Sequence, residues 1–149
     1  MDLTPNFSLG ELSHSDVALR RGYDNTPNER ETANLKRLAE TLLEPARAML
    51  GVPMHVNSGF RCASVNAAVG GARNSAHMDG RACDFVPVGM DLLEAFTKLA
   101  HSDLPYDQII IECNAWIHLA VAELGTDSRR QAMVAGGGPG KWFYRRVTA

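Results

Sequence analysis

The chain has 149 residues, the size of one domain, since single domains cluster near about 100–150 residues. Its composition, 45% hydrophobic and 21% charged, is ordinary for a folded protein and excludes a disordered or collagen-like chain. The net charge is −2, too balanced for a nucleic-acid binder, because such proteins concentrate positive charge. We therefore expect one domain over residues 1–149 and no nucleic acid among its partners.

The N-terminal part is predicted to be helical. The Ser8–Glu11 stretch has capping-box spacing, so a short helix is expected to begin there. A second helix is expected to begin at Thr26 as N-cap, with a proline in its first turn. It carries one apolar stripe with three- and four-residue steps: Leu35, Leu38, Ala39, Leu42, Ala46, Met49 and Leu50. Pro45 cannot donate an amide hydrogen bond to Thr41, so a kink or break is expected.

The rest of the chain is predicted to be mostly strands. The expected elements, in chain order, are a strand at 54–58, a glycine-bearing loop at 59–80 with a short helix near 65–69, a strand at 81–88, a helix at 91–101, strands at 108–112 and 116–122, a breaker cluster at 136–140, and an aromatic and basic tail at 141–146. Helices followed by strands with tight turns predict an α+β domain. We expect a small, mostly antiparallel sheet with helices packed on one face.

The chain has three cysteines, Cys62, Cys83 and Cys113, and no Cys-x-x-Cys pair. This favours buried free thiols over a disulfide framework or a zinc knuckle. The N-terminus lacks a basic segment followed by an apolar run, and no stretch approaches the roughly 18 apolar residues of a membrane span. We expect a protein made in the cytoplasm, without a signal peptide or a membrane span.

Three residues are candidates for a metal site: His77, Asp84 and His118. Alternation along the 81–88 strand places Asp84 opposite Cys83, so the carboxylate can face a cleft while the thiol faces the core. The same alternation puts His118 and Trp116 on one face. Two imidazoles and one carboxylate are a ligand set of catalytic zinc, although a histidine on a sheet face is more often structural.

The pattern Ser75-x-His77-x-x-Gly80-x-Ala82-x-Asp84, followed by Trp116-x-His118, resembles the zinc D-Ala-D-Ala carboxypeptidase family of peptidoglycan peptidases. That superfamily of metallopeptidases includes D-alanyl-D-alanine dipeptidases and, more distantly, lysostaphin-type peptidases and the hedgehog domain. Further ordered matches extend the resemblance over nearly the whole chain: 7–12, 43–47, 56–61, 65–71 and 106–112. The resemblance implies a hedgehog-like and DD-peptidase-like fold. It also implies a Zn²⁺ ion on His77, Asp84 and His118, with a zinc-activated water that attacks the scissile carbonyl.

The general base is where the sequence departs from this family. Several relatives carry an acidic residue three positions before the last ligand, but here that residue is Ala115. Glu112 is the expected substitute as base or acid. A three-residue turn at 113–115 would place Glu112 opposite Trp116, on the face of His118, whereas a two-residue turn would place it on the other face. A surface salt bridge is the alternative role for Glu112.

Other residues near this pattern have two interpretations each. Arg61 resembles the family arginine that stabilises the oxyanion or binds the substrate carbonyl. The alternative is an arginine on the rim of a loop without a role in the site. Ser75 matches a substrate-binding position of the family. Asp79 either orients an imidazole or faces solvent. The 141–146 tail either contacts a sugar-bearing wall polymer or packs on the core. The remaining histidines are expected to be surface or capping residues: His14, His55 and His101.

The resemblance implies a zinc metallopeptidase that hydrolyses peptide bonds of peptidoglycan, either as a D-Ala-D-Ala carboxypeptidase or as an endolysin-type endopeptidase. Two alternatives stay open. One is a zinc-containing wall-binding or structural module without turnover, which Ala115 favours. The other is a cytoplasmic dipeptidase that acts on free D-Ala-D-Ala. We expect a monomer encoded by a phage or prophage that acts on the cell wall, because no export signal is apparent.

Overall fold

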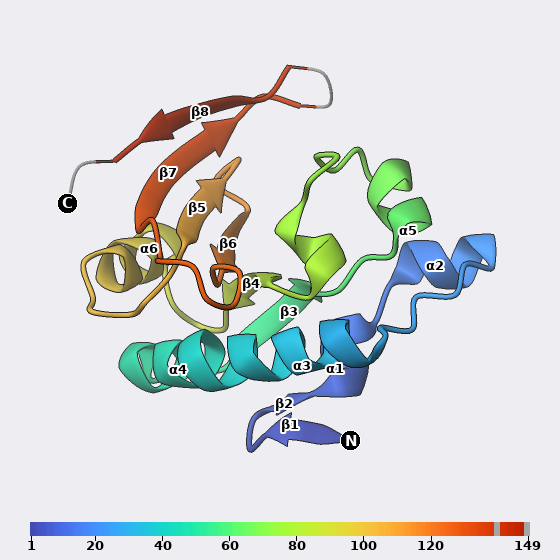
Figure 1. The fold of residues 1–149 in the computed structure, drawn as a ribbon. Helices are drawn as coiled ribbons and strands as arrows, with labels where there is room; N and C mark the ends of the chain where they lie inside the picture. The colour runs from blue at the N-terminus through green and yellow to red at the C-terminus, as the bar shows by residue number, and fades with distance from the viewer. Residues whose placement is uncertain (139–140, 148–149) are drawn as a thin grey trace.

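The structure is a computed structural model that describes residues 1–138 and 141–147. Its centre is a six-stranded sheet with the order β3-β4-β6-β5-β7-β8 (Figure 1). The strands are β3 (Met54–Ser58), β4 (Ala82–Pro87), β5 (Gln108–Glu112), β6 (Trp116–Ala120), β7 (Gln131–Gly136) and β8 (Phe143–Arg146). All neighbours pair antiparallel except β5 and β7, which are parallel. The predicted α+β class with a mostly antiparallel sheet is confirmed.

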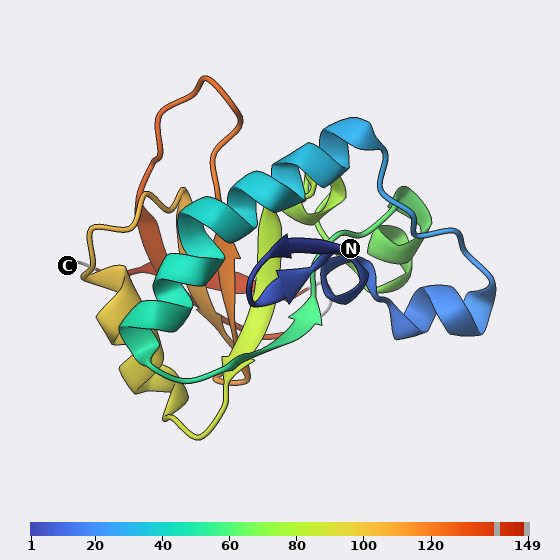
Figure 2. The ribbon, with the colours of Figure 1, turned by 90° about the horizontal axis from the view of Figure 1, so that it is seen from below.

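The helices are α1 (Leu9–Ser13), α2 (Asp16–Arg21), α3 (Glu29–Leu38), α4 (Glu44–Leu50), α5 (Ala63–Ala68) and α6 (Leu92–Ala100), with the short η1 (Ala39–Leu43) and η2 (Ala76–Asp79). Of these, α1, α3, η1, α4 and α6 pack their apolar residues against one face of the sheet. Seen from below, α3 and α4 form one rod across the sheet, with α6 beside its C-terminal end (Figure 2). Leu38 and Leu42 of the rod meet Ile117 and Leu119 of β6 in one apolar core. The opposite face of the sheet is therefore left to carry polar side chains.

The long helical rod changes its winding before Pro45. Residues Ala39–Leu43 form a π-helical turn in which the amide of Glu44 donates to the Ala39 carbonyl, five residues back. This wider turn accommodates a proline that cannot make the usual bond four residues back, so the predicted kink is a local π-bulge inside a continuous rod. Six residues of the predicted apolar stripe lie in the core, whereas Met49 is exposed: the six are Leu35, Leu38, Ala39, Leu42, Ala46 and Leu50.

Several predicted boundaries are wrong in detail. The N-cap of α3 is Asn28 rather than Thr26, because Asn28 and Glu31 exchange side-chain bonds with each other's amides at 2.8 Å. A two-stranded sheet, formed by β1 (Asp2–Thr4) and β2 (Phe7–Ser8), precedes the predicted first helix. The strand expected at 116–122 ends at Ala120. Of the predicted breaker cluster, Gly136 belongs to β7, and residues 139–140 lie outside the described residues.

The cysteine prediction is only partly right. Cys83 is buried and Cys62 is half-buried, but Cys113 is exposed, because it lies in the turn between β5 and β6. Within the ranges that the structure describes, no helix is long and apolar enough to span a bilayer.

Candidate metal centre

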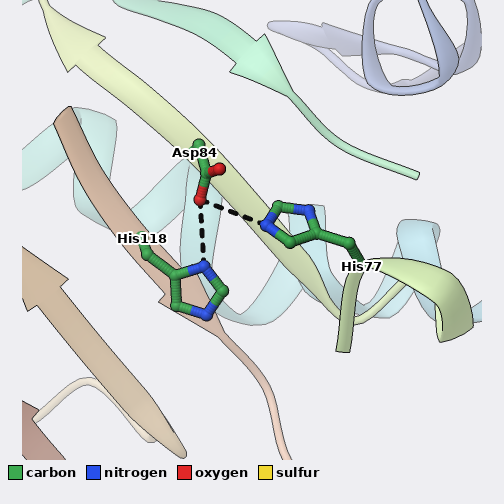
Figure 3. A group of neighbouring side chains, drawn as sticks. All are labelled: His77, Asp84 and His118. Atoms are coloured by element: carbon green, nitrogen blue, oxygen red, sulfur yellow. Dashed lines mark hydrogen bonds and ion pairs between the residues drawn. The ribbon is translucent and has the colours of Figure 1, made fainter. Parts of the chain in front are cut away.

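Three neighbouring elements bring the candidate ligands together on the polar face of the sheet. Asp84 of β4 and His118 of β6 are directly paired across the two strands. His77 reaches them from η2, where the Ser75 hydroxyl caps the turn and accepts a hydrogen bond from the His77 amide at 3.2 Å. All three side chains are buried and converge on one point (Figure 3).

The ligand atoms have the spacing that a tetrahedral metal ion requires. Asp84 Oδ1 lies 2.9 Å from His118 Nδ1 and 3.2 Å from His77 Nε2, and all three atoms lie within 4.8 Å of one another. Two ligands about 2.0–2.1 Å from a tetrahedral Zn²⁺ ion are about 3.3 Å apart. The two distances from Asp84 Oδ1 are close to that value, so the three residues fit a zinc ion, and a catalytic site of this kind leaves its fourth position to water.

The tautomer of His77 supports the same conclusion. Its Nδ1 donates to the carbonyl of Gly59 at 2.7 Å, because a carbonyl oxygen can only accept. Burial lowers the pKa of His77, and in the neutral ring with a protonated Nδ1 the other nitrogen, Nε2, carries a lone pair. That lone pair faces a carboxylate oxygen of Asp84, and two acceptors that face each other at this distance are stabilised by a shared cation.

Asp84 stays ionised although it is buried. Burial by itself would raise its pKa, but the positive charges and hydrogen bonds of His77 and His118 hold the pKa well below its usual value. For His118, burial alone would lower the pKa, whereas the hydrogen bond and charge of Asp84 raise it above the usual value. Asp84 therefore offers the site an ionised carboxylate as a candidate metal ligand.

Arg61 completes the arrangement around the carboxylate. Its guanidinium donates to Asp84 Oδ2 at 3.2 Å, to Ser58 Oγ at 3.0 Å and to Asn66 Oδ1 at 3.2 Å. The Asn66 side chain donates in turn to the Ala72 carbonyl at 2.8 Å. Arg61 thus occupies one oxygen of Asp84 and leaves the other to the imidazoles, and it also lines the cleft.

Glu112 lies on the same face as the ligands. The β5–β6 connection is a three-residue turn in which Cys113 and Asn114 have positive φ angles of 52° and 51°, and Glu112 pairs with Trp116. Burial raises the pKa of Glu112, and the charge of Asp84 raises it further. The Trp116 indole Nε1 is buried beside this carboxylate and has no hydrogen-bond partner among the described residues. Ala115 is exposed in the turn.

The metal centre forms part of the floor of a long cleft of about 1640 Å³. One end of the cleft is lined by residues of α2 and the α5 loop, such as Arg20 and Arg73. The other end is lined by Met133 of β7 and by Trp142 and Tyr144 at β8. This volume exceeds the roughly 300–1,000 Å³ of typical small-molecule pockets, so the cleft suits an extended ligand.

Comparison with known proteins agrees with this geometry. The sequence profile described as Peptidase M15 matches residues 5–120, which include all three candidate ligands. The chain belongs to the Peptidase M15 family. It is also 38% identical over 84 residues to the zinc D-Ala-D-Ala carboxypeptidase of Streptomyces albus G. That match covers 56% of this chain and 32% of the relative, so the chain spans about a third of the relative's length.

The structure also places the other residues of this M15 family member that the sequence singled out. Ser75 lines the cleft, as a substrate-binding residue must, and it also caps η2. Of the two roles considered for Asp79, the one in which it orients an imidazole is not found: its carboxylate is half-buried and accepts from Arg81 at 3.2 Å and from Arg30 at 3.3 Å. The acceptor that orients His77 is the Gly59 carbonyl instead.

None of the three remaining histidines joins the metal group. His14 pairs with Asp16 at 2.9 Å, His55 is exposed on β3, and His101 caps α6. Sequence reasoning assigned no role to Asn66, which holds Arg61. Trp142 and Tyr144 belong to the 141–146 tail, which was expected either to contact a wall polymer or to pack on the core, and both line the cleft. For Asn66 the only signal was its place in a stretch that matches the family.

Proposed function

We propose that this chain is a zinc-dependent peptidase that hydrolyses peptide bonds of bacterial peptidoglycan. The observation that carries the proposal is the convergence of His77, Asp84 and His118 at tetrahedral spacing on the floor of a cleft. The family match and the name of the curated relative support zinc as the metal and a D-alanyl peptide as the kind of substrate. A bound zinc ion would polarise the scissile carbonyl and lower the pKa of water.

The chain's own residues supply the proton transfers and the orientation. Glu112 is the general base: it shares the sheet face of His118, and its raised pKa brings the carboxylate closer to neutral pH. The same carboxyl group then returns the proton to the leaving amine. Arg61 holds Asp84 through one oxygen and lines the cleft, where its guanidinium can stabilise negative charge on the substrate carbonyl.

The cleft favours a polymer over a free dipeptide. A dipeptide would fill only a small part of a cleft of about 1640 Å³, and most of its surface would stay in water. We therefore propose that the substrate is the stem peptide or cross-link of the wall polymer, and that the cell wall is the place of action. Both a terminal D-Ala-D-Ala bond and an internal cross-link would satisfy this geometry, as in the carboxypeptidase and endolysin-type roles.

The test is cleavage of purified peptidoglycan and of a defined stem peptide, followed by mass spectrometry of the fragments. We expect release of free amino groups that stops when a zinc chelator is added and returns when zinc is restored. The fragment masses identify the bond. One stoichiometric zinc without any turnover on either substrate would refute the peptidase and support the alternative of a wall-binding module.

A further inference from the structure

The β7–β8 hairpin adds a wall to the cleft that the family match does not include. The match ends at residue 120, whereas β7 begins at Gln131 and β8 ends at Arg146. The hairpin projects on the side away from the α3–α4 rod (Figure 1). Two of its aromatic side chains, Trp142 and Tyr144, line the cleft and remain 39% and 56% exposed. Large aromatic surface is thus left uncovered inside the cleft.

Strand register connects this wall directly to the candidate base. Tyr144 pairs with Ala135, Ala135 with Glu112, and Glu112 with Trp116. Paired residues of neighbouring strands point to the same face of a sheet, so these four side chains form one row across β8, β7, β5 and β6. Ala135 lies between Tyr144 and Glu112 in this row, and its small side chain does not separate the two larger ones. The row leads from the metal centre to the aromatic side chains.

The opposite face of the hairpin fixes its orientation. The Phe143 ring packs over Gly136, where a side chain would collide with it: an added Cβ would lie 2.5 Å from Phe143 Cζ. Phe143 neighbours Tyr144 along the strand and therefore points to the other face. With Phe143 packed on that side, Tyr144 is held toward the cleft.

The aromatic wall lies at a definite distance from the reacting bond. β8 is three strand positions from β6, which carries His118, and neighbouring strands are about 4.8 Å apart, so the separation is about 14 Å. An extended peptide advances about 3.3–3.6 Å per residue. About four residues therefore span the gap, and a short stem peptide whose C-terminal part lies at the metal centre reaches the wall with the end that joins the sugar.

We propose that Trp142 and Tyr144 form a saccharide-binding subsite that holds the glycan part of the substrate. This inference rests on the proposed peptidoglycan substrate. Sugar rings present faces of C–H bonds, which complement the electron-rich face of an aromatic ring. Acidic peptide groups do not, because the same ring face repels carboxylates. Alanine methyl groups bury too little area to need two large rings. The glycan is thus the part of the polymer that matches this surface.

Binding is tested first, without turnover. The zinc-loaded protein is titrated with soluble oligomers of N-acetylglucosamine, which carry no stem peptide to cleave, and the heat of binding is recorded by isothermal titration calorimetry. We expect a saturable change in the wild type and in Tyr144→Phe, which keeps the ring. We expect at least a several-fold weaker response in Trp142→Ala and in Tyr144→Leu. Arg145→Ala is the matched control, because Arg145 is exposed on the opposite face of the same strand.

Cleavage is tested second, on a stem peptide alone and on the same peptide attached to its disaccharide. In the wild type, kcat/KM is expected to be about tenfold higher on the sugar-bearing substrate, and this ratio should fall towards one in the Trp142→Ala/Tyr144→Ala double variant. Circular dichroism checks that each variant is folded. Arg145→Ala should keep the wild-type ratio.

The outcomes separate the two proposals. If the wild type cleaves both substrates equally and binds no sugar oligomer, the subsite is refuted while the peptidase stands. If the peptide alone binds in a Trp142-dependent way, the wall is a peptide subsite and the saccharide proposal is wrong. If neither substrate is cleaved but sugar oligomers bind through Trp142, the proposed function fails and the saccharide site stands.

Discussion

The Glu112→Gln substitution tests the proposed chemistry most specifically, because it keeps the size of the side chain and removes only its ability to accept a proton. A positioned general base contributes about 10²–10⁴-fold to the rate. We expect kcat/KM on a stem peptide to fall within that range. Zinc stoichiometry should stay at one, because Glu112 is not among the three converging ligands.

The effect on zinc affinity can be bounded from the register. Glu112 pairs with Trp116, two residues from His118, so the carboxylate lies on a diagonal of about 7 Å from the metal ligands. In a water-filled cleft, loss of one negative charge at that distance from a divalent ion costs about 1 kcal/mol, which is less than a tenfold change in affinity. Rate and metal binding should therefore separate clearly.

The assay combines zinc quantification, a zinc competition titration and peptide cleavage across pH. Ionised Glu112 is the active form, so wild-type activity falls as pH decreases through its pKa, and this acid limb should disappear in Glu112→Gln. Glu123→Gln is the matched control, since Glu123 lines the far part of the cleft and is 69% exposed. A Glu112→Gln protein within threefold of the wild type would refute the base assignment, and a loss of zinc would show a ligand role.

Two further predictions concern the frame around the site. Gly59→Ala would place a Cβ 2.2 Å from the Leu12 carbonyl oxygen and displace the Gly59 carbonyl that orients His77. We expect the free energy of unfolding, measured by chemical denaturation, to fall by about 1–3 kcal/mol and zinc binding to weaken. An unchanged stability and an unchanged zinc affinity would contradict this packing. Asp107 accepts from Arg129 at 2.7 Å, and this hydrogen bond lowers its pKa below 3.8. The stability that ionised Asp107 contributes to the fold is therefore fully present above pH 3.8. It is lost as the pH falls through the lower pKa that Asp107 has in the folded protein. Asp107→Asn should cost about 1–2 kcal/mol at pH 7 and much less in strong acid, and an equal cost at both would refute the linkage.

Local patterns predicted the elements that local interactions decide. The bounds of β5 match the prediction, because apolar alternation and the following turn are both encoded within a few residues. The start of α3 shows the limit of this reasoning. Thr26 and Asn28 are both good N-cap residues, and the reciprocal bonds of Glu31, three residues after Asn28, decide between them.

The β7–β8 hairpin shows what a local pattern does not encode. β7 contains alanine and glycine and has little strand propensity of its own, and it is held by parallel pairing with β5, more than twenty residues earlier. The expected tail at 141–146 therefore becomes an exposed edge strand rather than a strand packed on the core. Only the tertiary structure shows that Trp142 and Tyr144 enter the same cleft as the metal centre.

Within the site, alternation correctly predicted the faces of Asp84 and His118, and the resemblance supplied the grouping with His77. The turn length settled the face of Glu112, which the sequence had left open. The sequence left two roles open for Asp79, and the structure decides between them because Arg30, which is distant along the chain, and Arg81 offer charge-assisted hydrogen bonds to its carboxylate.

The central claim is tested most directly by determining the crystal structure of the protein purified with zinc and locating the metal by anomalous scattering. We predict one ion per chain, bound by His77 Nε2, Asp84 Oδ1 and His118 Nδ1 at about 2.0–2.2 Å, and no ion in a His118→Ala crystal grown in the same way. Zinc bound elsewhere, or absent at full zinc saturation while the three side chains keep their positions, would contradict the proposed metal centre.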